Sequence, residues 1–203
     1  MKRVFLFLLL LTLARGNGEE EALRGKPGAA YNLGVYHYSR GEYPQAIFWW
    51  RLSWIRGQER AGTLINSLKR RLGIREGSLF RRAHPDLPAA LLLLVLLAFL
   101  AYNGYLLYRR SRPALMAEAL FLAAAAALFL LTLRERSYYL NPPLCVVGER
   151  GRIYSAPSPN LPVEELLPGE ELRCLETRPS WVKVETPWGT VGWVRRKGLI
   201  MLR

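Results

Sequence analysis

Apolar residues along the chain fall into three continuous blocks, which alternate with segments of mixed polarity. The first block, residues 4–14, follows Lys2 and Arg3 and is too short to span a hydrocarbon layer of about 30 Å. A basic start followed by a short apolar run is typical of a secretory signal peptide. We therefore predict a signal peptide over residues 1–16 and a polar linker over residues 17–28.

The other two blocks are each long enough for one helical crossing of a membrane. Residues 89–108 carry no charge, and residues 114–133 carry only Glu118. Twenty helical residues extend about 30 Å, and neither block has the polar face of a surface helix. We predict two transmembrane helices joined by a short loop, residues 109–113. Two buried helices of a soluble core are the alternative, and they would need a large protein around them.

The arginines around this hairpin give opposing indications of its orientation. Arg109, Arg110 and Arg112 favour a loop in the cytoplasm, because short cytoplasmic loops are enriched in basic residues. Basic residues before the first block and after the second favour the opposite orientation. Export of the N-terminal segment agrees with a cytoplasmic loop. We therefore predict a protein of the bacterial cytoplasmic (inner) membrane, with the segments on both sides of the hairpin outside the cytoplasm.

A helical module is predicted between the linker and the first membrane block. Over residues 29–80, aromatic and aliphatic residues recur at helical spacing, with breaks at Gly41 and around Gly57. The order of small and large residues resembles a tetratricopeptide repeat, in which small residues let two antiparallel helices approach. The positions that carry the resemblance are Leu33, Gly34, His37, Gly41, Tyr43, Ala46 and Trp50. The resemblance implies a helical hairpin that binds protein partners.

The helical module is also rich in aromatic residues, most of which we expect in its core. Trp49 and Trp50 are adjacent in the sequence and point in different directions on a helix. At least one of them is therefore a candidate for an exposed anchor that contacts a partner or the membrane interface.

Residues 141–203 change to short β-prone runs separated by Gly, Pro and Asn, which predicts a small all-β domain. Such short strands with tight turns favour a closed barrel. The expected strands are residues 144–147, 171–176, 181–185 and 190–194. The order of residues resembles the bacterial SH3 family, and the resemblance is carried by Pro157, Gly169, Trp181, Gly189, Gly192 and Trp193. Members of that family bind cell-wall peptides or protein segments, or only support neighbouring domains.

Two features of the all-β domain each allow two interpretations. Tyr154, Trp181 and Trp188 are candidates for an aromatic ligand groove, with ordinary packing of the domain as the alternative. Cys145 and Cys174 either form a disulfide, which an exported compartment would permit, or are two buried small apolar residues. Neither cysteine has the spacing of a metal site.

Composition excludes several other functions. The formal charge is +13, with 29 Lys and Arg that are spread over every segment and flank the apolar blocks. This distribution favours contact with anionic lipid headgroups over nucleic-acid binding. The two histidines, His37 and His84, have no evident catalytic partners in the sequence. We therefore expect no enzyme activity and no cofactor or metal.

The fold class expected is a multi-domain membrane protein: a signal, a tetratricopeptide-like module, a two-helix anchor and an SH3-like barrel. This order resembles the Bat proteins, named for Bacteroides aerotolerance, in the member that combines these modules. The resemblance implies a membrane-anchored scaffold with a role in envelope stress tolerance. Its implied partners are membrane proteins with von Willebrand-type domains and a MoxR-type ATPase. The alternative is a protein that binds or senses the cell wall (peptidoglycan) through the SH3-like domain.

Overall fold

The structure, a computed structural model, describes residues 19–202 except residues 76, 78, 110–114 and 160–161. The predicted signal peptide and most of the predicted loop therefore lie outside the described residues. The chain divides into two compact units. The hairpin unit consists of residues 83–139. The head unit combines the residues up to Arg82 with those from Leu140 onward, so the hairpin is an insertion within it.

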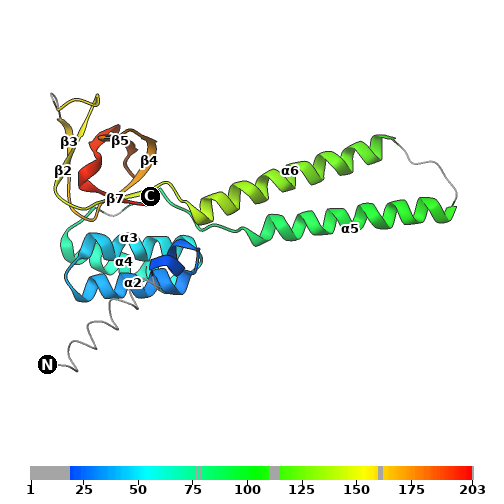
Figure 1. Cartoon of the computed structure of the whole chain (residues 1–203), viewed down its shortest axis with the longest axis horizontal. Helices are drawn as coiled ribbons and strands as arrows, with labels where there is room; N and C mark the ends of the chain where they lie inside the picture. Colours follow the sequence, from blue (N-terminus) through cyan, green and yellow to red (C-terminus); the bar gives the residue numbers. More distant parts are fainter. Residues whose placement is uncertain (1–18, 76, 78, 110–114, 160–161, 203) are drawn as a thin grey trace, which may run out of the picture. The chain divides into compact units, whose positions relative to one another are not determined.

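The N-terminal part of the head unit is a helical module of three helices, α2 (Pro27–Ser39), α3 (Tyr43–Ile55) and α4 (Glu59–Leu72) (Figure 1). The breaks between them fall at Gly41 and Gly57, as predicted. Their φ angles are 76° and 100°, in the left-handed region that glycine adopts without steric cost. A short helical turn over residues 19–23 precedes α2.

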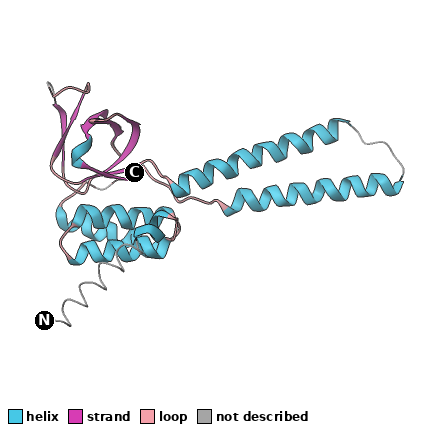
Figure 2. Cartoon of the chain, in the orientation of Figure 1, coloured by secondary structure: helices cyan, strands magenta, loops and turns pink. Residues whose placement is uncertain are grey.

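The C-terminal part of the head unit, the β-domain, is a seven-stranded antiparallel sheet with the order β3-β2-β6-β5-β4-β1-β7 (Figure 2). The strands are β1 (Leu144–Val147), β2 (Gly151–Tyr154), β3 (Pro162–Leu166), β4 (Glu171–Thr177), β5 (Trp181–Glu185), β6 (Val191–Arg195) and β7 (Leu199–Met201). The four predicted runs are β1, β4, β5 and β6. Among the described residues no pairing joins the edge strands β3 and β7, so closure into a barrel stays a prediction.

The core of the β-domain is formed by one face of the curled sheet. Val182 and Val184 of β5 are fully buried, as the alternation of apolar residues along that strand predicts. Gly192 lets β6 approach β2 closely, because a Cβ at this position would clash with Ile153 and with the backbone of Tyr154. The remaining core residues are Cys145, Val147, Ile153, Leu166, Leu172 and Val194.

A disulfide joins the two cysteines of the β-domain. Cys145 lies in β1 and Cys174 in β4, with 5.9 Å between their Cα atoms. The two strands are also hydrogen-bonded neighbours in the sheet. The disulfide therefore adds a covalent link between the paired strands β1 and β4.

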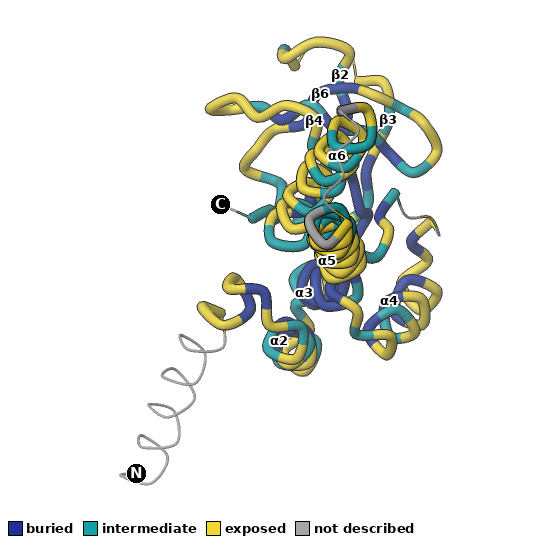
Figure 3. The backbone as a smooth tube through the Cα atoms, turned by 90° about the vertical axis from the view of Figure 1, so that its right-hand side faces the viewer, coloured by how far each residue is buried: buried dark blue, intermediate teal, exposed yellow. Residues whose placement is uncertain are grey.

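Helix α3 is the centre of the head unit. It packs against α2 and α4 on one side and against β1 and β7 on the other, and Figure 3 shows it as mostly buried. Trp49 and Trp50 are 7% and 2% exposed. The prediction that one of them is an exposed anchor is therefore wrong. A helix between two layers has no solvent-facing side, so both tryptophans are buried.

The hairpin unit consists of two long helices, α5 (Asp86–Arg109) and α6 (Leu115–Leu140). Their segments Asp86–Leu106 and Met116–Leu140 have mean hydropathy 2.1 and are long enough to cross a membrane. The most apolar window of each is 0% buried, which argues against two core helices of a soluble protein. Phe121 of α6 packs against two aromatic rings of α5, with ring centroids 5.6 and 5.8 Å apart.

The contact between α2 and α3 gives a direct test of the helical packing. A Cβ at Gly34 would overlap the indole of Trp50, whereas a Cβ at Gly28 of the same helix meets open space. We expect Gly34→Ala to lower the free energy of unfolding by about 1–3 kcal/mol through overpacking. Gly28→Ala, the matched control, should leave it unchanged or slightly higher. Denaturant unfolding of the detergent-solubilised protein measures both, and equal stability of the two variants would contradict this packing.

Candidate functional site

The residues of the tetratricopeptide-like pattern meet where α2 and α3 pack together. Leu33, Gly34, Ala46 and Trp50 are buried at this contact, and Gly41 forms the turn between the two helices. Tyr43 is partly exposed at the start of α3. These positions therefore shape the hairpin itself.

His37 has a partner that the sequence analysis missed. Its Nδ1 lies 2.6 Å from Oε2 of Glu42, and its side chain is 8% exposed. His37 belongs to α2, and Glu42 precedes the first residue of α3. The pair links the end of one helix to the beginning of the next, which is a structural role.

A recess of about 350 Å³ lies among the three helices of the helical module. The indole Nε1 of Trp50 is buried and has no hydrogen-bond acceptor among the described residues. Tyr38 contacts the Trp50 ring, and its hydroxyl accepts a hydrogen bond of 2.9 Å from Arg71. Aromatic and aliphatic side chains make up most of the recess lining, and Trp50 also packs against Gly34.

The residues of the SH3-like pattern are spread over the β-domain. Gly169 and Gly189 adopt φ angles of 92° and 93° in turns. Trp193 is almost fully buried in β6, next to Gly192. Pro157, after β2, lines a groove. The pattern therefore combines turn glycines, one core tryptophan and one surface position.

A groove of the head unit has a volume of about 1280 Å³. Trp181 forms part of its wall, together with Pro157, Pro159 and Pro179. Helix α3 contributes Gln45, so the groove includes residues of both the β-domain and the helical module.

The three aromatic residues proposed as a ligand groove are not all in one place. Tyr154 and Trp181 contact each other edge to face, with ring centroids 5.5 Å apart. Trp188 lies elsewhere: its Nε1 donates a 2.9 Å hydrogen bond to Glu164, and the guanidinium of Arg75 lies 4.8 Å from its ring centroid. The Trp188 side chain therefore contacts Glu164 and Arg75 instead, beyond the end of β5 that is opposite Trp181.

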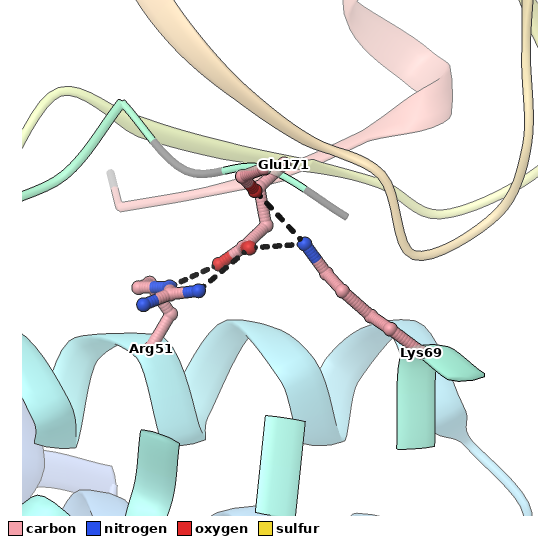
Figure 4. Close-up of polar contacts among 4 residues, drawn as sticks. Arg51, Lys69 and Glu171 are labelled. Carbon is pink, nitrogen blue, oxygen red and sulfur yellow. Dashed lines mark hydrogen bonds and ion pairs between the residues drawn. The ribbon is translucent and has the colours of Figure 1, made fainter. Parts of the chain in front are cut away.

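Three buried charged side chains form a cluster between the helical module and the β-domain (Figure 4). Glu171, the first residue of β4, is 1% exposed. Arg51 of α3 donates from Nε and Nη2 to the two carboxylate oxygens of Glu171. Lys69 of α4 donates to Oε2 of Glu171 at 2.5 Å and to the carbonyl of Gly77 at 3.3 Å. One carboxylate thus accepts hydrogen bonds from two helices.

The electrostatics of this cluster favour an ionised carboxylate. Burial by itself raises the pKa of Glu171, but the Arg51 guanidinium and the Lys69 ammonium outweigh burial and hold the pKa below its ordinary value. A buried charge is costly unless it is paired and hydrogen-bonded. Because the cations come from α3 and α4, this condition is met only when the two modules are packed together.

Apolar contacts surround the ion cluster and extend the same interface. A Cβ added at Gly169 would lie 2.7 Å from Ile74 and 2.9 Å from Ile47, so only glycine fits between the turn and the helical module. Arg173 of β4 donates a 2.8 Å hydrogen bond to the carbonyl of Leu79. The two modules therefore share one continuous, well-packed interface.

Sequence analysis did not find this cluster, although one of its members carries a signal. Arg51 is the single charge in a run of apolar and aromatic residues, which makes a buried, paired arginine a reasonable expectation. Glu171 lies 120 residues further along the chain and looks like any charged residue at the start of a strand. Nothing local in the sequence connects the two.

Comparison with protein-family models, with curated proteins and with solved structures finds no match to the chain. Among the described residues, no three His, Cys, Asp or Glu side chains group as metal ligands. Function must therefore be argued from the interface, the groove and the apolar hairpin.

Removal of the Glu171 charge tests the ion cluster. Glu171→Gln leaves Arg51 and Lys69 buried without a counter-charge, so we expect the free energy of unfolding near neutral pH to fall by about 3–5 kcal/mol. Glu165→Gln is the matched control, because its ion pair with Arg152 is exposed and should change stability by less than about 1 kcal/mol. Denaturant unfolding in detergent measures both variants.

The pH dependence separates an electrostatic effect from a packing defect. Because the pKa of folded Glu171 lies below its ordinary value of 4.5, its stabilising effect is present above that value and is lost as the pH falls through the folded pKa. The stability difference between wild type and Glu171→Gln should therefore shrink in acid. Burial raises the pKa of Glu170, but this effect is common to both proteins. A stability difference between wild type and Glu171→Gln that does not depend on pH would contradict an ionised Glu171 in the folded protein.

Proposed function

We propose that this protein is a non-enzymatic, membrane-anchored scaffold whose head unit presents two binding modules on one side of the membrane. One observation carries the proposal: the segments before and after the apolar hairpin fold into a single unit, with Glu171 buried between Arg51 and Lys69. Two crossings return the chain to the side on which it started. The interface therefore supports a two-helix anchor.

We further propose that the helical module is tetratricopeptide-like and that the β-domain is a bacterial SH3-like barrel. The close approach of Gly34 to Trp50 supports the first assignment. Seven short antiparallel strands, with Gly192 at a tight inter-strand contact, support the second. Both folds serve as binding modules in many proteins.

We place the head unit outside the cytoplasmic membrane. The disulfide between Cys145 and Cys174 supports this side, because disulfides persist in oxidising compartments. The signal-like residues 1–16 and the arginines of residues 109–113 favour the same orientation.

The partners we propose are those that the order of modules implies: Bat-type membrane proteins with von Willebrand-type domains and a MoxR-type ATPase system, acting in envelope stress tolerance. A scaffold suits this role because two modules on one anchor raise each other's effective concentration at a shared assembly. The packed interface adds that the two modules are presented together.

Binding or sensing of cell-wall peptide through the β-domain is the second candidate function. The groove beside Trp181, with its proline wall, favours it. A pull-down of the intact protein on purified peptidoglycan separates this candidate from a scaffold. The intact chain is required, because the isolated β-domain would expose the Glu171 carboxylate and the interface around it.

Affinity purification from detergent-solubilised membranes tests the scaffold directly. We expect tagged full-length protein to recover a reproducible set of membrane proteins, because its modules bind them. The control carries the same tag on residues 83–139 alone, which retains the apolar helices and lacks the head unit. Full-length protein that is repeatedly recovered without partners, or with the same proteins as the control, would contradict the proposal.

A further inference from the structure

The charged residues that line the groove beside Trp181 are all positive. Among its described lining residues, the charged ones are Arg195, Arg196 and Lys197, and no carboxylate lines it. All three are exposed. None of them has an ion-pair partner among the residues that the structure describes. Arg195 instead lies over the ring of Trp181, 5.6 Å from its centroid. The basic side chains are therefore available to an acidic ligand.

The shape and walls of the groove suit an extended chain. Three prolines and Trp181 provide rigid apolar surface, which binds a ligand at little cost in conformational entropy. The lining also includes β7, which is an edge strand of the sheet. Grooves with an aromatic wall and neighbouring sheet edges are surfaces on which extended peptides bind. The volume of about 1280 Å³ accommodates several residues of such a peptide.

A lipid surface fits these observations less well. Binding to headgroups needs basic residues on a surface that can lie flat against the membrane, and no concave wall is required. Here the cations line a recess together with three prolines, Trp181 and the apolar residues of β7. The ligand must therefore enter the recess as well as neutralise its charge.

We propose that this groove binds an extended, acidic segment of a partner protein, with its carboxylates on Arg195, Arg196 and Lys197 and its apolar atoms against Trp181. This inference rests on the proposed scaffold function and specifies the chemistry of one partner. Gln45 lies in α3, the helix that also carries Arg51, so the helical module adds one residue to a groove that the β-domain otherwise forms.

The test uses full-length protein in detergent micelles and a fluorescein-labelled peptide in which Glu alternates with Pro. Proline keeps this peptide extended, and a peptide with Gln in place of Glu is the uncharged probe. Fluorescence anisotropy should show saturable binding of the Glu peptide that weakens as salt is added. The Gln peptide should bind roughly tenfold more weakly or not at all.

Variants separate the groove from the general positive charge of the protein. Arg195→Gln, Arg196→Gln and Lys197→Gln together should weaken binding of the Glu peptide roughly tenfold. Arg24→Gln, Arg60→Gln and Arg70→Gln together remove the same charge from the N-terminal part of the head unit and should leave binding unchanged. Trp181→Ala should weaken binding to both peptides, because it removes apolar contact. Denaturant unfolding of each variant shows whether the head unit is intact.

The outcomes distinguish this inference from the function on which it rests. Equal binding of the two peptides, or equal loss in both triple variants, would overturn the acidic-peptide assignment while co-purification of partners still supports a scaffold. Binding to phosphatidylglycerol vesicles or to peptidoglycan that depends on Arg195, Arg196 and Lys197, with no binding of the Glu peptide, would also overturn it. Peptide binding that disappears in folded Gln45→Ala protein would support a groove made by both modules.

Discussion

The structure depends on one buried carboxylate that cannot be left unpaired. Glu171 enters the interface at the start of β4 and is neutralised by Arg51 and Lys69, which belong to two different helices. A charge taken out of water is costly without partners. The β-domain supplies the carboxylate and the helical module supplies the two cations, so each module neutralises the buried charge of the other. The turn before β4 also fits this interface closely, because Gly169 packs between Ile47 and Ile74. The ion cluster determines which surfaces of the two modules meet. It contributes less to stability, because an apolar interface would avoid the cost of burying charges.

The interface also constrains how the apolar hairpin functions. Residues 83–139 interrupt the sequence of the head unit without interrupting its fold, so the two halves must fold together across an inserted apolar hairpin. An even number of membrane crossings would satisfy this condition, and the two helices of the hairpin unit are long and apolar enough for two crossings. The groove beside Trp181 borders the same contact, since Gln45 of α3 lines it together with residues of the β-domain.

Much of the fold could be predicted because its signals are local. Glycines mark the helix breaks, long apolar runs mark α5 and α6, and alternation marks β5. Strand β3 was missed because its residues, Pro162–Leu166, are mostly exposed and include two glutamates. The errors at the site have a different origin. Trp49 and Trp50 look like surface anchors until a second layer covers α3, and Trp188 lies apart from Trp181 because β5 separates them. Such facts depend on contacts between distant segments, as does the pairing of Arg51 with Glu171.

The most direct test of the account asks whether both parts of the head unit occupy one compartment. Arg60→Cys in α4 and Arg150→Cys before β2 place single exposed thiols on the two sides of the hairpin, while the native cysteines remain joined. A membrane-impermeant maleimide is applied to spheroplasts before and after lysis. We predict that both positions are labelled without lysis, to the same extent. Labelling of one position in intact spheroplasts and of the other only after lysis would contradict the account.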